Sequence, residues 1–303
     1  MVNFVLIGLC VLAGMIFKST KSIHPDAHKG INTWILYLAL PAVSFKYLPK
    51  VEWSLEMLFP IFSTVLIAVG SLFFMKYYSQ AKNYSRRSRS TLEIASGYSN
   101  TSFIGFPLIA AFYNEKLLSI AIISDQTMFL TLSTLGIISA LKGGSKSGSV
   151  SSKFILKRLF TFPPFIGCIS ALVISQFINL DFAEPLFDKL AGTVAPLALF
   201  SVGLQLKFSG WRKLIPQISM SMLYKLLLAP LIVLLVAFAL GIKGNVAKIS
   251  VFEAAMPTLI TSSIIAEQFR LNARLINLII GVSILVGFIT TAFWNSILQL
   301  LGI

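Results

Sequence analysis

Two polar stretches interrupt long apolar segments of this chain, and they constrain its fold more than any other feature. The first, residues 99–107 (SNTSFIGFP), lies inside an apolar segment over residues 91–113, and the second, residues 253–263 (EAAMPTLITSS), lies about half a chain later. Polar residues with Gly and Pro leave backbone groups unpaired. Hydrocarbon supplies no water to satisfy them, so such interruptions are tolerated only where they line a cavity within protein. Two interruptions in corresponding positions of two halves predict a transporter binding site.

Composition places the chain among membrane proteins. Hydrophobic residues make up 56% of it, charged residues 12%, and its mean hydropathy is +0.84, well outside the range of soluble domains. Most of its apolar segments approach the ~20 residues that an α-helix needs to cross ~30 Å of hydrocarbon. We distinguish ten of them: 2–17, 31–48, 55–78, 91–113, 117–141, 159–178, 185–206, 214–242, 246–269 and 275–303. The first is short but has no basic start and no cleavage site, so we expect a retained helix, with an export signal as the alternative.

The basic residues indicate the orientation in the membrane. The net charge of +14 could suggest a nucleic-acid partner, but the charges are divided among loops and do not gather on one face, so we expect none. The loops after odd-numbered segments carry 18 Lys and Arg residues, and the loops after even-numbered segments carry 6. The positive-inside rule then places the odd-numbered loops in the cytoplasm and both termini outside. We expect a multi-pass protein of the cell membrane, either an inner or a plasma membrane.

A low-complexity stretch near the middle of the chain separates two halves. Residues 143–149 (GGSKSGS) are typical of a flexible linker. The prediction is a first five-helix repeat over residues 1–142, a cytoplasmic linker over 143–153 and a second repeat over 154–303. Because five is odd, the second set of helices enters the membrane from the opposite side, so any repeat must be inverted.

Matched prolines support this repeat. Pro41 and Pro196 are 155 residues apart, and Pro107 and Pro257 are 150 residues apart in the same order. Coincidence is the alternative, because prolines are common in transmembrane helices. The predicted fold class is an all-α integral membrane protein with ten transmembrane helices in an inverted 5+5 repeat.

No catalytic constellation is present in the sequence. It contains no Gly-x-Ser-x-Gly, Walker loop, His-Glu-x-x-His or Cys-x-x-Cys motif, so we expect neither an enzyme nor a bound cofactor. His24 and His28 flank Asp26, but Pro25 argues against a helix that would place both imidazoles on one face. We predict a solvated loop there and no metal site.

Two carboxylates, Asp125 and Glu253, lie well inside apolar segments. An intramembrane carboxylate is expensive to bury and indicates a functional site by default. Such a group can bind and release a proton, or bind sodium where carbonyls and hydroxyls surround it, so we predict coupling to H⁺ or Na⁺ here. The alternative is a carboxylate that holds an interruption together through hydrogen bonds to backbone amides. Glu93, beside Arg89 near the membrane edge, is expected to form a helix-end ion pair.

Side chains at the two interruptions favour an anion. The half-helix that begins after each interruption points the positive end of its dipole toward the midplane. Hydrogen-bonding side chains gather beside these ends: Asn100, Thr101, Ser102, Thr258, Thr261, Ser262 and Ser263. Lys225, inside the eighth segment, could add positive charge, but we expect it to snorkel or to form an ion pair. Four tryptophans near segment ends are predicted to be interfacial anchors: Trp34, Trp53, Trp211 and Trp294.

Several motifs resemble the signatures of the auxin efflux carrier family, which includes bacterial carriers and the plant auxin exporters. They are found at residues 99–107, 255–258 (AMPT), 266–269 (AEQF), 40–42 (LPA) and 195–203 (APLALFSVG), so the resemblance covers the whole chain. It implies ten helices in an inverted repeat, with helices 4 and 9 broken and crossing at the midplane beside the substrate site. It also implies a homodimer and an elevator-like movement of the crossing bundle against a scaffold.

The same resemblance implies roles for individual residues. Asn100 matches the asparagine that faces the substrate carboxylate in plant members, and Pro107 and Pro257 match the crossover prolines. Gly105 belongs to the first of these motifs. The linker is far shorter here than the cytoplasmic loop of long plant exporters, so control by phosphorylation of that loop is not expected. Members are linked to dicarboxylates as well as to auxin-like acids, which leaves the substrate open within that class.

We therefore expect a secondary active transporter of small organic anions such as auxin-like acids or dicarboxylates, with possible cation coupling at Asp125 or Glu253. The predicted substrate-binding residues are Asn100, Thr101, Ser102, Gly105, Pro107, Pro257, Thr258, Thr261 and Ser262. The closest rival is a sodium-coupled symporter or sodium/proton antiporter of the same crossed-helix fold. A sensor that binds its ligand without moving it is a third hypothesis, disfavoured because the sequence shows no signalling domain.

Overall fold

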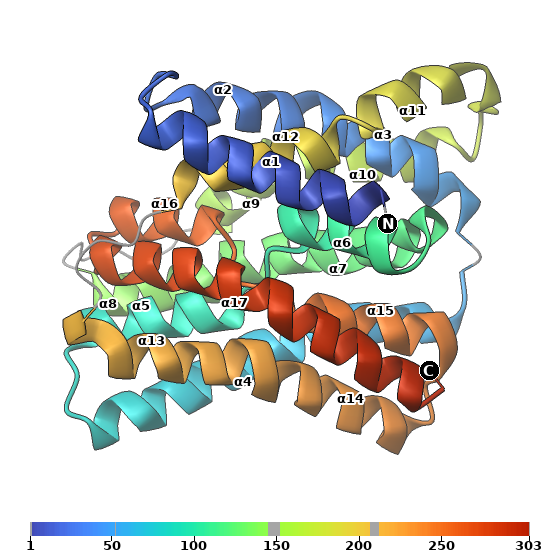
Figure 1. The fold of residues 1–303 in the computed structure, drawn as a ribbon. Coiled ribbons are helices and arrows are strands. Elements are labelled where there is room, and N and C mark those ends of the chain that lie inside the picture. Colours follow the sequence, from blue (N-terminus) through green and yellow to red (C-terminus); the bar gives the residue numbers. More distant parts are fainter. Residues whose placement is uncertain (1, 52, 145–151, 207–211, 303) are drawn as a thin grey trace. The chain divides into compact units, whose positions relative to one another are not determined.

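The computed structural model describes residues 2–51, 53–144, 152–206 and 212–302. Within these ranges the regular structure is helical, apart from one isolated antiparallel bridge, which confirms the predicted all-α class (Figure 1). The chain forms two compact units, each assembled from separate segments of both halves of the sequence. Unit 1 comprises Met1–Trp53, Ser102–Gln126 and Leu156–Leu206, and unit 2 comprises Ser54–Thr101, Thr127–Ile155 and Lys207–Ile303. Most of the predicted linker, residues 145–151, lies outside the described residues.

Many of the predicted apolar segments form helices of membrane-spanning character. In the described part of the chain, five helices are long and apolar enough to cross a membrane: Leu55–Ala81, Glu115–Gly143, Asp181–Gln205, Arg212–Leu240 and Ala273–Leu300. Three shorter apolar helices are Val5–Ser19, Thr101–Phe112 and Pro163–Ile174. Predicted segment 31–48 forms the run α2 (Ala27–Trp34), η1 (Ile35–Ala39) and α3 (Leu40–Tyr47), and segment 246–269 is divided between two helices. These lengths and compositions fit a multi-pass membrane protein.

Unit 1 is built around a close helix pair. Besides the α2 to α3 run and the start of α7, its elements are α1 (Val2–Ser19), η2 (Leu48–Lys50), α6 (Phe106–Phe112), η5 (Glu115–Leu117), most of α9 (Ser152–Phe160), α10 (Pro163–Ile174), η7 (Asp181–Ala183), α11 (Glu184–Ala191) and α12 (Val194–Gln205). Helices α1 and α12 lie side by side (Figure 1). A Cβ atom on Gly14 would lie 2.3 Å from the Phe200 carbonyl oxygen, and one on Gly203 would lie 2.3 Å from the Val11 carbonyl oxygen. Both glycines therefore permit a backbone approach of the kind that small residues provide between transmembrane helices.

Ion pairs join α3 and η2 to α11 and η5 within unit 1. The Lys46 ammonium lies 2.9 Å from the Asp188 carboxylate and 3.6 Å from that of Glu115, and Lys50 pairs with Glu184 at 2.5 Å. Lys46 and Glu115 border a cavity of about 170 Å³ that Pro107 of α6 also lines. The predicted site residue Pro107 therefore lies beside a polar cluster in unit 1.

Unit 2 contains the remaining helices. It also contains the first polar interruption as far as Thr101 and the whole of the second interruption. Its elements are η3 (Leu55–Met57), α4 (Leu58–Ala81), α5 (Arg86–Gly97), the end of α7 (Leu118–Thr131), η6 (Leu132–Gly136), α8 (Ile137–Gly143), η8 (Arg212–Leu214), α13 (Ile215–Met222), η9 (Leu223–Leu228), α14 (Ala229–Leu240), α15 (Gly244–Ala254), α16 (Thr261–Gln268) and α17 (Ala273–Leu300). Helices α4 and α5 pack closely against each other. Gly97 permits this approach, because a Cβ atom at this position would lie 2.3 Å from Ser71 Oγ.

The predicted ion pair of Glu93 is confirmed. Arg89 Nε lies 2.7 Å from Glu93 Oε1, and the carboxylate also accepts a hydrogen bond from Ser139 of α8. The Glu93 side chain is 5% exposed and that of Arg89 is 30% exposed. The pair is more deeply buried than a surface helix-end pair, because α8 covers the carboxylate.

The tryptophan prediction is wrong for one residue. Trp34 and Trp53 are exposed, and Trp211 lies outside the described residues. Trp294 is buried in α17, and its indole Nε1 donates a 2.8 Å hydrogen bond to the Leu226 carbonyl oxygen. Leu226 belongs to the π-helical segment η9, where the wider turn changes the usual pairing of the backbone. The indole satisfies a backbone acceptor there and does not anchor an interface.

Candidate substrate site at the interrupted helices

Both predicted interruptions are breaks in helical hydrogen bonding. Helix α5 ends at Gly97, and helical structure resumes with the π-helical segment η4 (Thr101–Gly105), which leads into α6. Helix α15 ends at Ala254, and helical structure resumes with α16 at Thr261. Pro257 contributes to the second break because it has no backbone N–H to continue the helical pattern.

The two breaks pair with each other inside unit 2. Ser99 and Thr258 form an antiparallel bridge. The Asn100 backbone N–H donates to the Pro257 carbonyl oxygen at 2.8 Å, and the Leu259 N–H donates to the Tyr98 carbonyl oxygen at 2.9 Å. Residues about 160 positions apart in the chain thus satisfy one another's backbone groups, as buried irregular backbone requires.

Thr258 satisfies the end of α5 through its hydroxyl and contacts α17 through its backbone N–H. Its Oγ1 donates a 2.8 Å hydrogen bond to the carbonyl oxygen of Ala95, near the end of α5. That carbonyl would accept from the Ser99 N–H in a continuous helix, but the Ser99 N–H points to Met128 Sδ at 3.4 Å. The Thr258 N–H donates to Ser283 Oγ of α17 at 3.1 Å. The side chain of Thr258 is therefore a structural element of the pairing.

The buried side-chain amide of Asn100 is the feature of this site that indicates a ligand. Its side chain is 0% exposed, and within the described residues neither Oδ1 nor Nδ2 has a hydrogen-bond partner. Ser99 Oγ and Ser262 Oγ are likewise buried without a partner there. Buried polar side-chain atoms are nearly always paired, so a group of unpaired ones needs an explanation. An amide has two N–H donors that suit a carboxylate.

The predicted substrate residues fall in both compact units. Asn100, Thr101, Pro257, Thr258, Thr261 and Ser262 belong to unit 2, where the bridge brings Asn100 and Thr101 next to Pro257 and Thr258. Ser102, Gly105 and Pro107 are buried in unit 1. Asp125 is also in unit 1 and is 8% exposed, with Gln126 Nε2 3.3 Å from its Oδ2. The two predicted coupling carboxylates thus lie in different units, and their roles stay predictions.

Glu253 has a neighbour that the sequence did not predict. Glu253 is 2% exposed in the last turn of α15, and its carboxylate interacts electrostatically with Lys225. The Lys225 side chain is fully buried, and its Nζ donates a 2.6 Å hydrogen bond to the Ala254 carbonyl oxygen. Lys225 therefore does not snorkel. Its ammonium is bound by a backbone carbonyl, and the alternative expectation of an ion pair stays a prediction.

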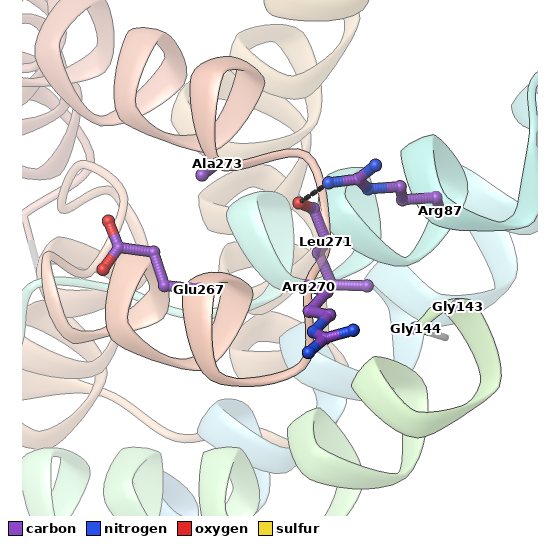
Figure 2. Close-up of a pocket in the computed structure, with 7 residues that line it drawn as sticks. All are labelled: Arg87, Gly143, Gly144, Glu267, Arg270, Leu271 and Ala273. Atoms are coloured by element: carbon purple, nitrogen blue, oxygen red, sulfur yellow. Dashed lines mark hydrogen bonds between the residues drawn. The ribbon is translucent and has the colours of Figure 1, made fainter. Parts of the chain in front are cut away.

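A basic pocket lies at the other end of α5. Its volume is about 520 Å³, and it is lined by Arg87, Gly143, Gly144, Glu267, Arg270, Leu271 and Ala273. Figure 2 shows the Arg87 guanidinium donating to the Leu271 carbonyl oxygen, at 2.8 Å, while the Glu267 carboxylate points away from both arginines. A second pocket of about 350 Å³ is lined by Arg86, Arg89, Ser90 and Lys142. The ten helical steps from Arg87 to Gly97 span about 15 Å, so this end of α5 is well separated from the interruption.

Interrupted helices with buried polar donors, in a multi-pass chain, are features of membrane transporters. The family model described as "Membrane transport protein" matches residues 2–295, and the chain belongs to this family, the auxin efflux carrier family.

Relatives of the chain carry transporter names. An "Uncharacterized transporter" of Methanothermobacter thermautotrophicus is 24% identical over 95% of this chain and 95% of its own length. A "Putative malonate transporter" of Rhizobium meliloti is 27% identical over 81% of this chain and 79% of its own length. A "Probable auxin efflux carrier component 9" of Oryza sativa subsp. japonica is 26% identical over 49% of this chain and 36% of its own length.

Proposed function

We propose that the chain is a secondary active transporter of small organic anions, with the anion's carboxylate bound by the Asn100 side chain at the paired interruptions. The observation that carries this proposal is the fully buried Asn100 amide, which has no hydrogen-bond partner within the described residues. A carboxylate is a strong acceptor for its two N–H donors, and charge-assisted hydrogen bonds are stronger than neutral ones.

Two further observations support an anionic substrate. The relatives include proteins named for malonate, a dicarboxylate, and for auxin. The pocket at the start of α5 is lined by Arg87 and Arg270, with the second basic pocket also at that end of the helix. The charge pattern of the loops predicts that this end faces the cytoplasm. A positively lined entrance raises the local concentration of anions.

The proposed arrangement of the helices places the substrate site in the middle of the membrane. Ten helices in an inverted 5+5 repeat, with helices 4 and 9 broken and crossing, would place the paired interruptions at the midplane, where transporters bind their substrates. We propose an elevator-type movement for alternating access and a homodimeric assembly in the cell membrane with both termini outside. Family membership and the apolar helices support a multi-pass membrane transporter, and these features are proposed in addition.

Transport by the purified protein in liposomes tests the proposal. Labelled malonate and labelled auxin are the probes, with membrane, proton and sodium gradients imposed one at a time. We expect saturable flux of at least one probe, abolished or strongly reduced in Asn100→Ala. Absence of flux for both carboxylates under every gradient would overturn the carrier function, whereas binding without flux would favour the sensor.

A sodium-coupled symporter or sodium/proton antiporter is the second candidate. It is favoured by Glu253, a buried carboxylate in the last turn before the α15 interruption, since freed carbonyls at half-helix ends can coordinate Na⁺ together with a carboxylate. Sodium-dependent thermal stabilisation of the wild-type protein that disappears in Glu253→Gln, with no response to carboxylates, would select this candidate.

A further inference from the structure

Lys225 presents its ammonium group to the end of α15 at the second interruption. Its side chain has 0% exposure, and its Nζ lies 2.6 Å from the carbonyl oxygen of Ala254, the last residue of α15. A fully buried lysine needs a partner that compensates its charge. The carboxylate of Glu253, the neighbouring residue, interacts with that charge.

The break in α15 makes this helix end attractive to a cation. In a continuous helix, the Ala254 carbonyl would accept from the Thr258 N–H, but that N–H donates to Ser283 Oγ. The Glu253 carbonyl cannot accept from residue 257, which is proline and has no N–H, and accepts from the Met256 N–H at 3.2 Å instead. The C-terminal end of a helix also carries a negative partial charge. Such carbonyls and a carboxylate are the groups with which interrupted transporter helices hold Na⁺.

The segment that carries Lys225 is fixed on both sides of it. Lys225 lies in the π-helical segment η9, a type of turn that is frequent at functional sites. The preceding residue, Tyr224, donates its hydroxyl to the Ile67 carbonyl oxygen of α4 at 2.7 Å. The carbonyl oxygen of the following residue, Leu226, accepts from Trp294 Nε1 of α17 at 2.8 Å. These contacts hold Lys225 in place against α15.

We infer that the Lys225 ammonium is a built-in cation: it takes the place that a coupling Na⁺ would occupy against Glu253 and the end of α15, so that transport does not require sodium. The inference rests on the proposed function and chooses among its coupling alternatives. A Na⁺ ion added beside the same carboxylate would face repulsion from the ammonium.

Thermal unfolding of the purified full-length protein tests this inference without any substrate. The unfolding midpoint is measured in NaCl and in choline chloride at equal ionic strength. We expect the wild-type midpoint to be the same in both salts. In Lys225→Gln, which leaves the Glu253 carboxylate without its cation, we expect a lower midpoint in choline and a rise of at least about 2 °C in sodium, because a bound ion stabilises the folded state.

Two variants serve as controls. Lys225→Gln/Glu253→Gln removes both charges and is expected to show no sodium response, and Lys243→Gln, which removes an exposed lysine just before α15, is expected to behave like the wild type. Sodium-specific stabilisation of the wild-type protein would overturn the inference, as would a folded Lys225→Gln variant that ignores Na⁺, K⁺ and Li⁺ alike.

If Lys225→Gln does not fold, the inference is tested by measuring carboxylate transport by the wild-type protein. Equal carboxylate flux with sodium and with choline on both sides of the membrane supports the built-in cation, and an absolute requirement for sodium overturns it. A failure of the proposed function is recognised separately, since it would appear as absence of flux under every gradient while the sodium dependence of unfolding is still measurable.

Discussion

The backbone N–H of Asn100 donates a 2.8 Å hydrogen bond to the carbonyl oxygen of Pro257. Through this bond the residue with the unpaired buried amide is held by the residue that helps to end the other helix. A displacement of the second interruption would therefore move the Asn100 side chain. The same backbone pairing that satisfies the two helix ends also positions the group that we assign to the substrate.

Replacement of Asn100 by alanine is expected to separate binding from stability. The side chain makes no hydrogen bond within the described residues, so we expect the unfolding midpoint of Asn100→Ala without ligand to stay within about 2 °C of the wild type. Loss of two hydrogen bonds to a carboxylate would weaken its binding by at least about 100-fold. Stabilisation by malonate or auxin in a thermal-shift titration measures both effects.

The matched control is Asn295→Ala. Asn295 is also a buried asparagine of unit 2, and its Oδ1 has no partner within the described residues, but it lies in α17 outside both interruptions. Its ligand response should equal that of the wild type. Equal loss of ligand response in both variants would mean that Asn100 has no special role.

Thr258→Val is expected to destabilise the fold. Valine keeps the shape of threonine but removes the hydroxyl that donates to the Ala95 carbonyl oxygen, which leaves a buried acceptor at the end of α5 unsatisfied. The expected loss is about 1–3 kcal/mol of unfolding free energy, to be read from thermal or denaturant unfolding in detergent. Thr258→Ser retains the hydroxyl and should recover most of the loss; a valine variant as stable as the wild type would show that this hydrogen bond contributes little.

The interruptions themselves could be predicted from sequence because they depend on local chemistry. The polar run around Asn100, the missing N–H of Pro257 and the buried carboxylate of Glu253 are visible without any structure. The Arg89 and Glu93 pair follows from helical spacing of four residues. The family resemblance implied that the two broken helices cross, but the sequence did not reveal which atoms pair there, since the bond from Asn100 to Pro257 joins residues far apart in the chain.

The wrong expectations for Lys225 and Trp294 share one structural cause. Trp294 was expected at the membrane interface, and snorkelling was one of the two expectations for Lys225, yet both side chains are buried. Lys225, in the π-helical segment η9, donates to the Ala254 carbonyl, and Trp294 donates to the carbonyl of Leu226 in the same segment. A helical pattern with a constant period of 3.6 residues gives no warning of a π-helical turn. The composition of the segment is uniformly apolar, and its backbone acceptors become available only once neighbouring helices have packed against it.

The buried ion pair at the start of α5 gives a prediction about paired charges. Arg89→Met leaves the Glu93 carboxylate, 5% exposed, without its cation, and we expect a loss of about 2 kcal/mol of unfolding free energy, because a buried charge loses its partner. In Arg89→Met/Glu93→Met neither charge remains, so the double variant should be more stable than Arg89→Met. Denaturant unfolding of both variants and the wild type measures the difference; additive losses would contradict the coupling of the two residues.

Neutralising Arg270 tests the basic pocket as an entrance for anions. Arg270 has a backbone φ of 55°, a left-handed conformation that asparagine tolerates better than most residues, so Arg270→Asn removes the charge without straining the turn after α16. If the pocket collects anions electrostatically, the variant should need a several-fold higher malonate concentration for half-maximal flux from the side that this pocket faces, with an unchanged maximal rate. The deficit should shrink as ionic strength rises, because salt screens the attraction.

Lys29→Asn, which removes an exposed charge in unit 1, is the control. A deficit that does not depend on ionic strength would instead indicate that Arg270 contributes by contact or by structure.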